Sequence, residues 1–174
     1  KGHVNVENNE QFLSWLQLSY IRRDNFNMSD LFTLGTYVQL FYSTRRLSKT
    51  YQATMMQAAA FTPTQNSIFC YDPKFRANQF IAGGIIPIFK LNNYMQVRPG
   101  FYSFLPYRKI YENSNGTPYY SKKRFNDYQF IADLTFVAQF SNITASAFVN
   151  YYSSTPKRVN FGISVGWFMF NERF

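Results

Sequence analysis

The sequence predicts an all-β protein, and more narrowly an antiparallel transmembrane β-barrel with about eight strands in this chain of 174 residues. Three observations lead to this expectation. Apolar and polar residues alternate over long segments, aromatic residues recur near both ends of these segments, and long and short connections alternate along the chain. We treat residues 1–174 as a single domain of this kind or as part of one.

The composition fits a sheet that has one apolar and one wet face. Aromatic residues make up 21% of the chain, with 20 Phe and 14 Tyr, yet the mean hydropathy is −0.30. The most apolar run, 80–89, is shorter than the roughly 20 residues of a membrane helix and is interrupted by glycines and a proline. Strands that meet hydrocarbon on one side and water on the other combine these properties.

Four segments form the first half of the predicted sheet. Segments 10–22 and 49–61 carry aromatic residues near both ends, namely Phe12, Tyr20, Tyr51 and Phe61. Segment 31–43 has two distinct faces, with Phe32, Leu34, Val38, Leu40 and Tyr42 opposing Thr33, Gly35, Tyr37 and Gln39. Segment 78–89 contains Pro87, and the next segment Pro99; each requires a bulge or weakened pairing in a central strand.

Four further segments follow, at 93–106, 128–140, 142–152 and 158–170. In 128–140 the even positions are all apolar or aromatic: Tyr128, Phe130, Ala132, Leu134, Phe136, Ala138 and Phe140. Segments of about eleven to thirteen residues exceed the usual soluble strand of about 5–6 and suit a tilted membrane strand of about 9–11. Aromatic residues at both ends, as in 31–43 and 128–140, resemble the two interfacial girdles of a barrel.

The lengths of the connections predict an orientation. Outer-membrane barrels have short periplasmic turns and longer external loops, and their last strand runs toward the periplasm. Counting back from the C-terminus, we expect 153–158, 107–127, 62–77 and 23–30 to lie outside. The links at residue 141, at 90–93 and at 43–49 are then periplasmic, although 43–49 is long for such a turn.

A net charge of +9 raises the question of an anionic partner. The basic residues lie at breaks between the apolar segments, as in TRRLSK at 44–49 and SKKR at 121–124. Interfacial cations that face anionic headgroups account for this distribution, so outer-membrane lipids and lipopolysaccharide are the expected partners. We expect no nucleic-acid partner, because no recognition helix, zinc-finger spacing or RNP-like signature is present.

Residues 162–166 read GISVG, which matches the G-x-S-x-G signature of serine hydrolases. That chemistry needs a sharp strand-to-helix turn, whereas Gly162, Ser164 and Gly166 share one parity of a continuous strand. The one histidine, His3, lies in the polar N-terminal stretch, and no aspartate is followed by Gly or Ala as a Ser–Asp dyad of the patatin type requires. With a single cysteine and no ligand cluster, the sequence predicts no catalytic, cofactor-binding or metal-binding residues.

Two sets of residues are nevertheless candidates for a role. The last strand carries a polar residue, a glycine and two alternate apolar or aromatic residues at the spacing that barrel-assembly machinery reads: Asn160, Gly162, Val165 and Trp167. On the inward face, Arg98 and Asp133 are candidates for a charge network in the lumen, and simple hydration of both groups remains the alternative. The chain begins without Met or a signal segment, so we expect a processed form or an excerpt.

Several stretches resemble the C-terminal barrel of the patatin-like phospholipases of Bacteroidetes, within the BamA or surface-antigen barrel superfamily. They are FTPTQNSIF at 61–69, FRANQFIAGGI at 75–85, VRPGFYSFLPYR at 97–108 and NFGISVGWFMFN at 160–171. The resemblance implies the C-terminal half of a larger, 16-stranded barrel in the bacterial outer membrane. It also implies an upstream patatin domain that hydrolyses acyl esters, and none of that catalytic apparatus can be placed on this chain.

The expected function is a membrane anchor that displays or translocates the upstream domain. A stand-alone small barrel, structural or lipid-modifying, is the first alternative, and its enzymatic form would depend on His3 and Ser164. A barrel subunit of a larger outer-membrane complex and a soluble all-β binding module are the others.

Overall fold

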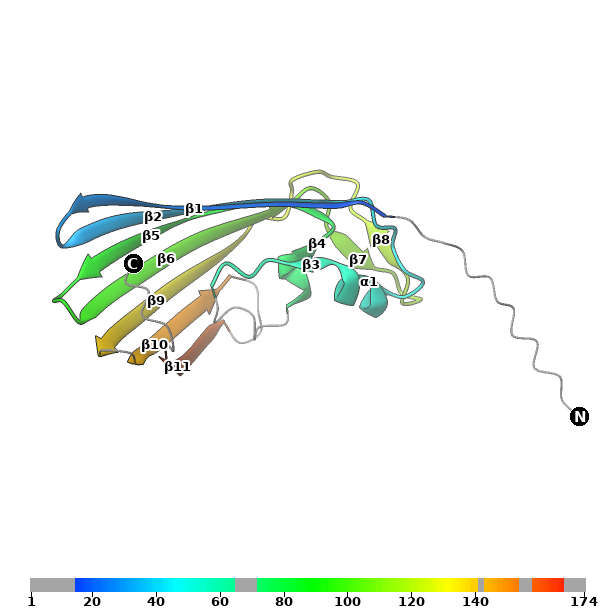
Figure 1. Cartoon of the computed structure of the whole chain (residues 1–174). Coiled ribbons are helices and arrows are strands. Elements are labelled where there is room, and N and C mark those ends of the chain that lie inside the picture. The colour runs from blue at the N-terminus through cyan, green and yellow to red at the C-terminus, as the bar shows by residue number, and fades with distance from the viewer. Residues whose placement is uncertain (1–14, 65–71, 141–142, 154–157, 168–174) are drawn as a thin grey trace, which may run out of the picture.

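The computed structural model describes residues 15–64, 72–140, 143–153 and 158–167, and 64% of this part of the chain is in β-strands and 7% in helices. One antiparallel sheet dominates (Figure 1), with seven strands in the order β1-β2-β5-β6-β9-β10-β11. Its strands are β1 Gln17–Ser29, β2 Phe32–Ser43, β5 Gln79–Lys90, β6 Met95–Pro106, β9 Gln129–Phe140, β10 Ile143–Tyr152 and β11 Val159–Trp167. The predicted all-β, antiparallel class is confirmed.

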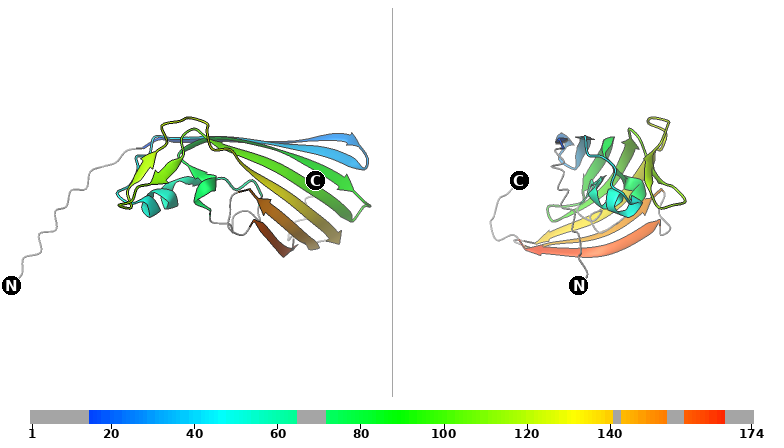
Figure 2. Two further views of the ribbon diagram at one scale, coloured as in Figure 1. Left: turned by 180° about the vertical axis from the view of Figure 1, so that it is seen from behind. Right: turned by 90° about the vertical axis from the view of Figure 1, so that its right-hand side faces the viewer.

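The sheet curves into an open arc, with β1 and β11 at its two edges (Figure 2). Strands that are neighbours in this sheet also follow one another along the chain. Two segments that add no strand to it lie between β2 and β5 and between β6 and β9. In the residues that the structure describes, β1 pairs only with β2 and β11 only with β10. The arc therefore has a convex face, a concave face and two free edges.

The prediction of a strand at 49–61 is wrong. Residues Tyr51–Gln57 form helix α1, and Ala59–Ala60 form the short strand β3. Thr50 caps the helix by accepting a hydrogen bond from the backbone N–H of Ala53. The stretch QATMMQ consists mainly of good helix formers, a local preference that outweighed its flanking aromatic residues.

The connections confirm the predicted alternation of lengths, but two of them were assigned wrongly. The strand ends that short links join, in β1–β2, β5–β6 and β9–β10, lie at one end of the sheet. Those that longer links join, in β2–β5, β6–β9 and β10–β11, lie at the other (Figure 1). Residues 23–30, expected as a loop, lie almost entirely within β1. Residues 43–49, expected as a periplasmic turn, begin the longest connection, which explains their length.

We call segment 44–78 the insert. Its described residues, 44–64 and 72–78, fold back toward the concave face and also contain the 3-10 turn Pro73–Phe75 and strand β4 Arg76–Ala77. β3 pairs with β4 in a small sheet of its own. The connection after β6 forms a hairpin of β7 Ile110–Glu112 and β8 Pro118–Tyr120, against which α1 packs through Met55. No helix in the described ranges is both long and apolar enough to cross a membrane.

The prediction of weakened pairing at the prolines is confirmed. The register between β5 and β6 is the same on both sides of a gap of three residue pairs, from Ile85↔Phe101 to Phe89↔Val97. That register places Pro87 opposite Pro99, and neither residue has a backbone N–H to donate. The ladder is therefore interrupted without a bulge.

Candidate functional site

The convex face carries exposed apolar side chains on all seven strands. In β9, Phe130, Leu134 and Phe136 are exposed on this face, while Ile131 and Asp133 are buried on the other. The pairing continues the apolar face sideways, since Leu134 lies opposite Pro99 on one side and Val149 on the other. The same face includes Leu18, Tyr20, Val38, Leu40, Ile81, Ile85, Phe101, Val149, Phe161, Ile163 and Val165.

Exposed aromatic residues lie near both ends of this face. At the short-link end Tyr94 and Phe140 stack with their ring centroids 6.5 Å apart, and at the long-link end Tyr42 and Tyr128 are exposed. The aromatic pair predicted for 49–61 does not contribute, because Phe61 is buried in the insert. The convex face is thus apolar in the middle, with amphipathic or aromatic rings toward its ends.

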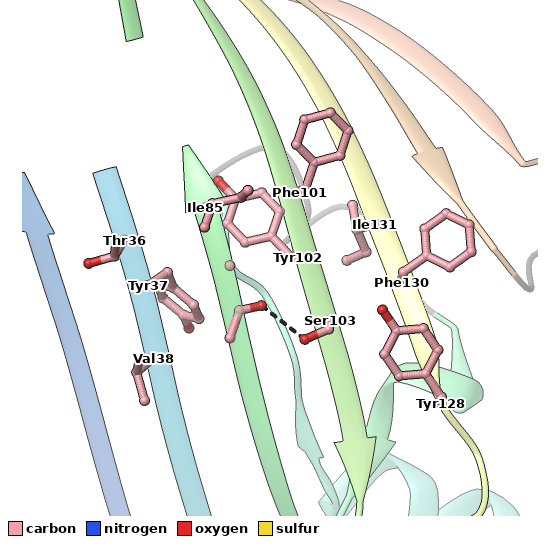
Figure 3. A pocket seen from close by; sticks show the side chains of 12 residues that line it. Thr36, Tyr37, Val38, Ile85, Phe101, Tyr102, Ser103, Tyr128, Phe130 and Ile131 are labelled. Atoms are coloured by element: carbon pink, nitrogen blue, oxygen red, sulfur yellow. Dashed lines mark hydrogen bonds between the residues drawn. The ribbon is translucent and has the colours of Figure 1, made fainter. Parts of the chain in front are cut away.

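A shallow depression of about 570 Å³ lies in the convex face (Figure 3). Two small residues, Gly83 and Ser103, form the base of the depression. There the Ser103 hydroxyl donates a hydrogen bond of 3.3 Å to the backbone carbonyl of Gly83. Outward apolar side chains surround it, including Ile85, Phe101 and Phe130. A Cβ added to Gly83 would meet only the Tyr37 carbonyl, at 3.6 Å, so the depression exists because the side chain there is absent.

One polar pair interrupts the convex face. Arg22 and Asp24 lie on the outward side of β1, opposite Val38 and Thr36, and their Nε and Oδ2 atoms form an ion pair at 2.6 Å. Both side chains are partly or largely exposed. The pair keeps each charge compensated, and it lies on an edge strand rather than in the middle of the sheet.

The concave face holds both residues of the predicted charge network. Arg98 on β6 and Asp133 on β9 lie on neighbouring strands, where they pair with Thr135 and Gly100 respectively. Asp133 accepts hydrogen bonds from the Thr135 hydroxyl at 3.0 and 3.2 Å, and Arg98 Nε is buried without a hydrogen-bond partner. Within the described residues no ion pair joins the two groups, and the charge network of Arg98 and Asp133 stays a prediction.

Glycines on the concave face make room for aromatic rings. A Cβ on Gly84 or Gly100 would lie 2.4 or 2.8 Å from the ring of Tyr102, and one on Gly162 would lie 2.5 Å from the ring of Phe148. Gly84 and Gly162 are the direct cross-strand partners of these two aromatic residues. The rings thus lie flat across the glycines and cover backbone that would otherwise be open on the inside.

The insert fills the long-link end of the concave face with an aromatic core. The ring of Phe61 stacks on that of Phe104 at 5.5 Å, and Phe75 meets Tyr152 edge-on at 5.7 Å. Phe61 and Phe75 come from the insert, whereas Phe104 and Tyr152 come from β6 and β10. Sequence reasoning missed this packing because it assigned part of the insert to the wall of the sheet.

The predicted assembly-signal residues all lie on the edge strand β11. Asn160 and Gly162 are on the concave side, paired with Asn150 and Phe148, and Val165 is exposed on the convex side. The backbone of Trp167 ends the described part of β11, opposite Ile143. These positions match the expected inward and outward parity, and their role in assembly stays a prediction.

The interpretation of GISVG as part of an uninterrupted strand is confirmed, because Ser164 lies mid-strand in β11, opposite Ser146. His3, the base considered for an enzymatic site, lies outside the described residues. Over the ranges that the structure covers, no group of three or more His, Cys, Asp or Glu side chains is arranged to hold a metal ion.

No family model matches this chain, and neither a curated protein nor a solved structure does so. The class of protein is accordingly defined by its fold alone: an all-β chain with one curved antiparallel sheet that is apolar on its convex face and packs against the insert at one end of its concave face. The family resemblance stays a prediction that rests on the stretches quoted above.

Proposed function

We propose that this chain forms part of the wall of a transmembrane β-barrel in the bacterial outer membrane, with its convex face in lipid and its concave face toward a filled interior. One observation carries the proposal: seven strands of nine to thirteen residues all expose apolar side chains on the same face. These lengths suit tilted strands that cross a bilayer, which need about 9–11 residues.

Exposure of this apolar face to water would be energetically unfavourable. Full burial of a large apolar side chain contributes about 1.5–3 kcal/mol, and the face carries such side chains on every strand. Soluble monomers rarely expose contiguous apolar patches larger than a few hundred Å². The hydrocarbon core of a bilayer can cover the whole curved face, whereas a protein partner would need a surface of complementary shape. The aromatic residues toward both ends of the face suit the two membrane–water interfaces.

The concave face supports the same arrangement. It carries polar side chains such as Gln39 and Asp133, and at the long-link end it packs against the insert, as expected for the inside of a barrel rather than for a second lipid-facing surface. With the short links in the periplasm, the insert and the β7–β8 hairpin would lie at the external end.

The biological role that we propose is an anchor. If the resemblance to the patatin-associated barrels holds, the chain is the C-terminal half of a 16-stranded barrel that anchors, and displays or translocates, an upstream phospholipase domain. Barrel-assembly machinery would read the last strand through Asn160, Gly162, Val165 and Trp167, and other outer-membrane subunits are further candidate partners. The chain itself would perform no catalysis.

A pair of neighbouring cysteine substitutions tests the membrane arrangement. Ala147 points to the convex side and Ser146 to the concave side of β10, and each would be replaced by cysteine in a Cys70→Ser background. In reconstituted vesicles, Ala147→Cys should react with a membrane-dissolved maleimide and resist a polar methanethiosulfonate reagent, and Ser146→Cys should show the reverse. Equal reaction of both cysteines with the polar reagent would contradict the proposal.

A further inference from the structure

A second pocket, of about 360 Å³, lies at the long-link end of the sheet, where β2 ends and β5 begins. Its lining includes three arginines, Arg45, Arg46 and Arg108, together with Asn78 and Tyr120. No carboxylate lines it. The volume falls in the range of small-ligand pockets, which is about 300–1,000 Å³.

The positive charge of this pocket is not neutralised by the protein in the part of the chain that the structure describes. The two ion pairs there are Arg22–Asp24 and Lys109–Asp127, and neither involves an arginine of this pocket. The Arg108 Nε atom is buried and has no hydrogen-bond partner. A buried guanidinium donor without an acceptor is costly, and an anionic ligand would satisfy it.

The pocket is built on a fixed frame. The buried Asn78 side chain donates to the Arg45 carbonyl at 3.2 Å and to the Tyr120 hydroxyl oxygen at 2.7 Å. Because Tyr120 accepts this bond, its own proton remains to be donated to a ligand. The Arg45 guanidinium is held over the ring of Trp15, 4.5 Å from its centroid. The Tyr120 hydroxyl and the Arg45 side chain are therefore positioned before any ligand arrives.

We propose that this pocket binds a phosphate group, either on a lipid headgroup or as soluble phosphate. Guanidinium groups donate paired, charge-assisted hydrogen bonds that match phosphate oxygens, and Arg46 and Arg108 bring two such groups to one pocket. The Tyr120 hydroxyl adds a neutral donor. The pocket lies at the rim of the sheet, where the headgroups of a surrounding bilayer would be, but phosphate recognition itself does not require the membrane arrangement.

The test is isothermal titration calorimetry of the full chain in a phosphate-free maltoside detergent. Inorganic phosphate replaces chloride at constant ionic strength, so that screening stays fixed. A second titration uses phosphatidic acid in the same micelles. The variant Arg46→Gln/Arg108→Gln is compared with Lys122→Gln/Lys123→Gln, which removes the same charge from exposed side chains that do not line the pocket.

The wild type should bind at least one probe saturably. Loss of two charge-assisted contacts should weaken binding about tenfold or more in the arginine variant, and the lysine variant should change it less than about twofold. If phosphatidic acid binds at least about tenfold more tightly than inorganic phosphate, the site recognises a lipid headgroup. If the two affinities are similar, it recognises soluble phosphate. The single substitution Arg46→Gln, at an exposed position, repeats the test if the double variant does not fold. Absence of saturable binding, or equal losses in the arginine and lysine variants, overturns the proposal.

Discussion

Two neighbouring residues of β11 offer a sharp test of which face meets lipid. Ile163 points outward and is 80% exposed, and Ser164, the next residue, points inward and is also exposed. Arginine on the lipid face near the bilayer centre costs about 2–4 kcal/mol. Loss of the isoleucine contact with hydrocarbon adds about 1–2 kcal/mol. Ile163→Arg should thus lower the free energy of unfolding in lipid by about 3–6 kcal/mol.

Ser164→Arg places the same charge one residue along, in the wetter interior, and should change stability by less than about 1 kcal/mol. Both free energies are measurable by urea titration of the chain refolded into vesicles, with tryptophan fluorescence as the signal. In a soluble sheet both exposed substitutions would stay within about 0.5 kcal/mol of the wild type. That outcome, or a larger loss for Ser164→Arg, would refute the assignment of the convex face to lipid.

Three further predictions concern packing and charge. Gly162→Val should cost about 1–3 kcal/mol because its side chain would overlap the ring of Phe148, and adding Phe148→Ala should relieve most of this cost in a double-mutant cycle by urea titration. Arg22→Leu/Asp24→Leu removes an outward ion pair and should stabilise the lipid-embedded chain by at least about 1 kcal/mol; a loss of stability would show that this part of β1 does not face hydrocarbon. Phe61→Ala empties a fully packed site between the insert and the sheet, so we expect a loss of about 3–5 kcal/mol and earlier protease cleavage within 44–78; unchanged cleavage would contradict this role of Phe61.

The wall of the sheet could be predicted from the sequence because its signal is local. In β9 the period-2 alternation defines two faces directly, and the expected segment 128–140 differs from the observed strand by one residue. In β11 the alternation likewise predicts correctly that Gly162 lies on the concave face and Val165 on the convex face. A shift of the strand register by one residue would move every side chain of the strand to the opposite face of the sheet. The alternation in the sequence therefore specifies the register strongly.

The interior could not be predicted in the same way. Phe61 looks like a girdle residue in the sequence, but its position is decided by contacts with Phe104, more than forty residues away. The arginine pocket was missed for the same reason, because Arg46 and Arg108 converge only when β2 and β6 lie in one sheet. The helix-forming stretch QATMMQ was the one local signal that could have identified the insert.

In the part of the chain that the structure describes, β1 and β11 each pair on one side only, which bears on how the proposed barrel would close. In hydrocarbon each unsatisfied backbone N–H or C=O costs several kcal/mol, so β1 and β11 could not remain unpaired on their outer sides. Direct pairing of β1 with β11 would close a barrel of seven strands, narrower than one of about eight, whose interior is just wide enough for side chains. The concave face already packs against Phe61, Phe75 and Ala77 of the insert, so the interior of such a narrow barrel would have to hold these side chains as well as those of the strands. Both edges should therefore pair with additional strands, and this favours part of a larger barrel over a small barrel closed by these seven strands.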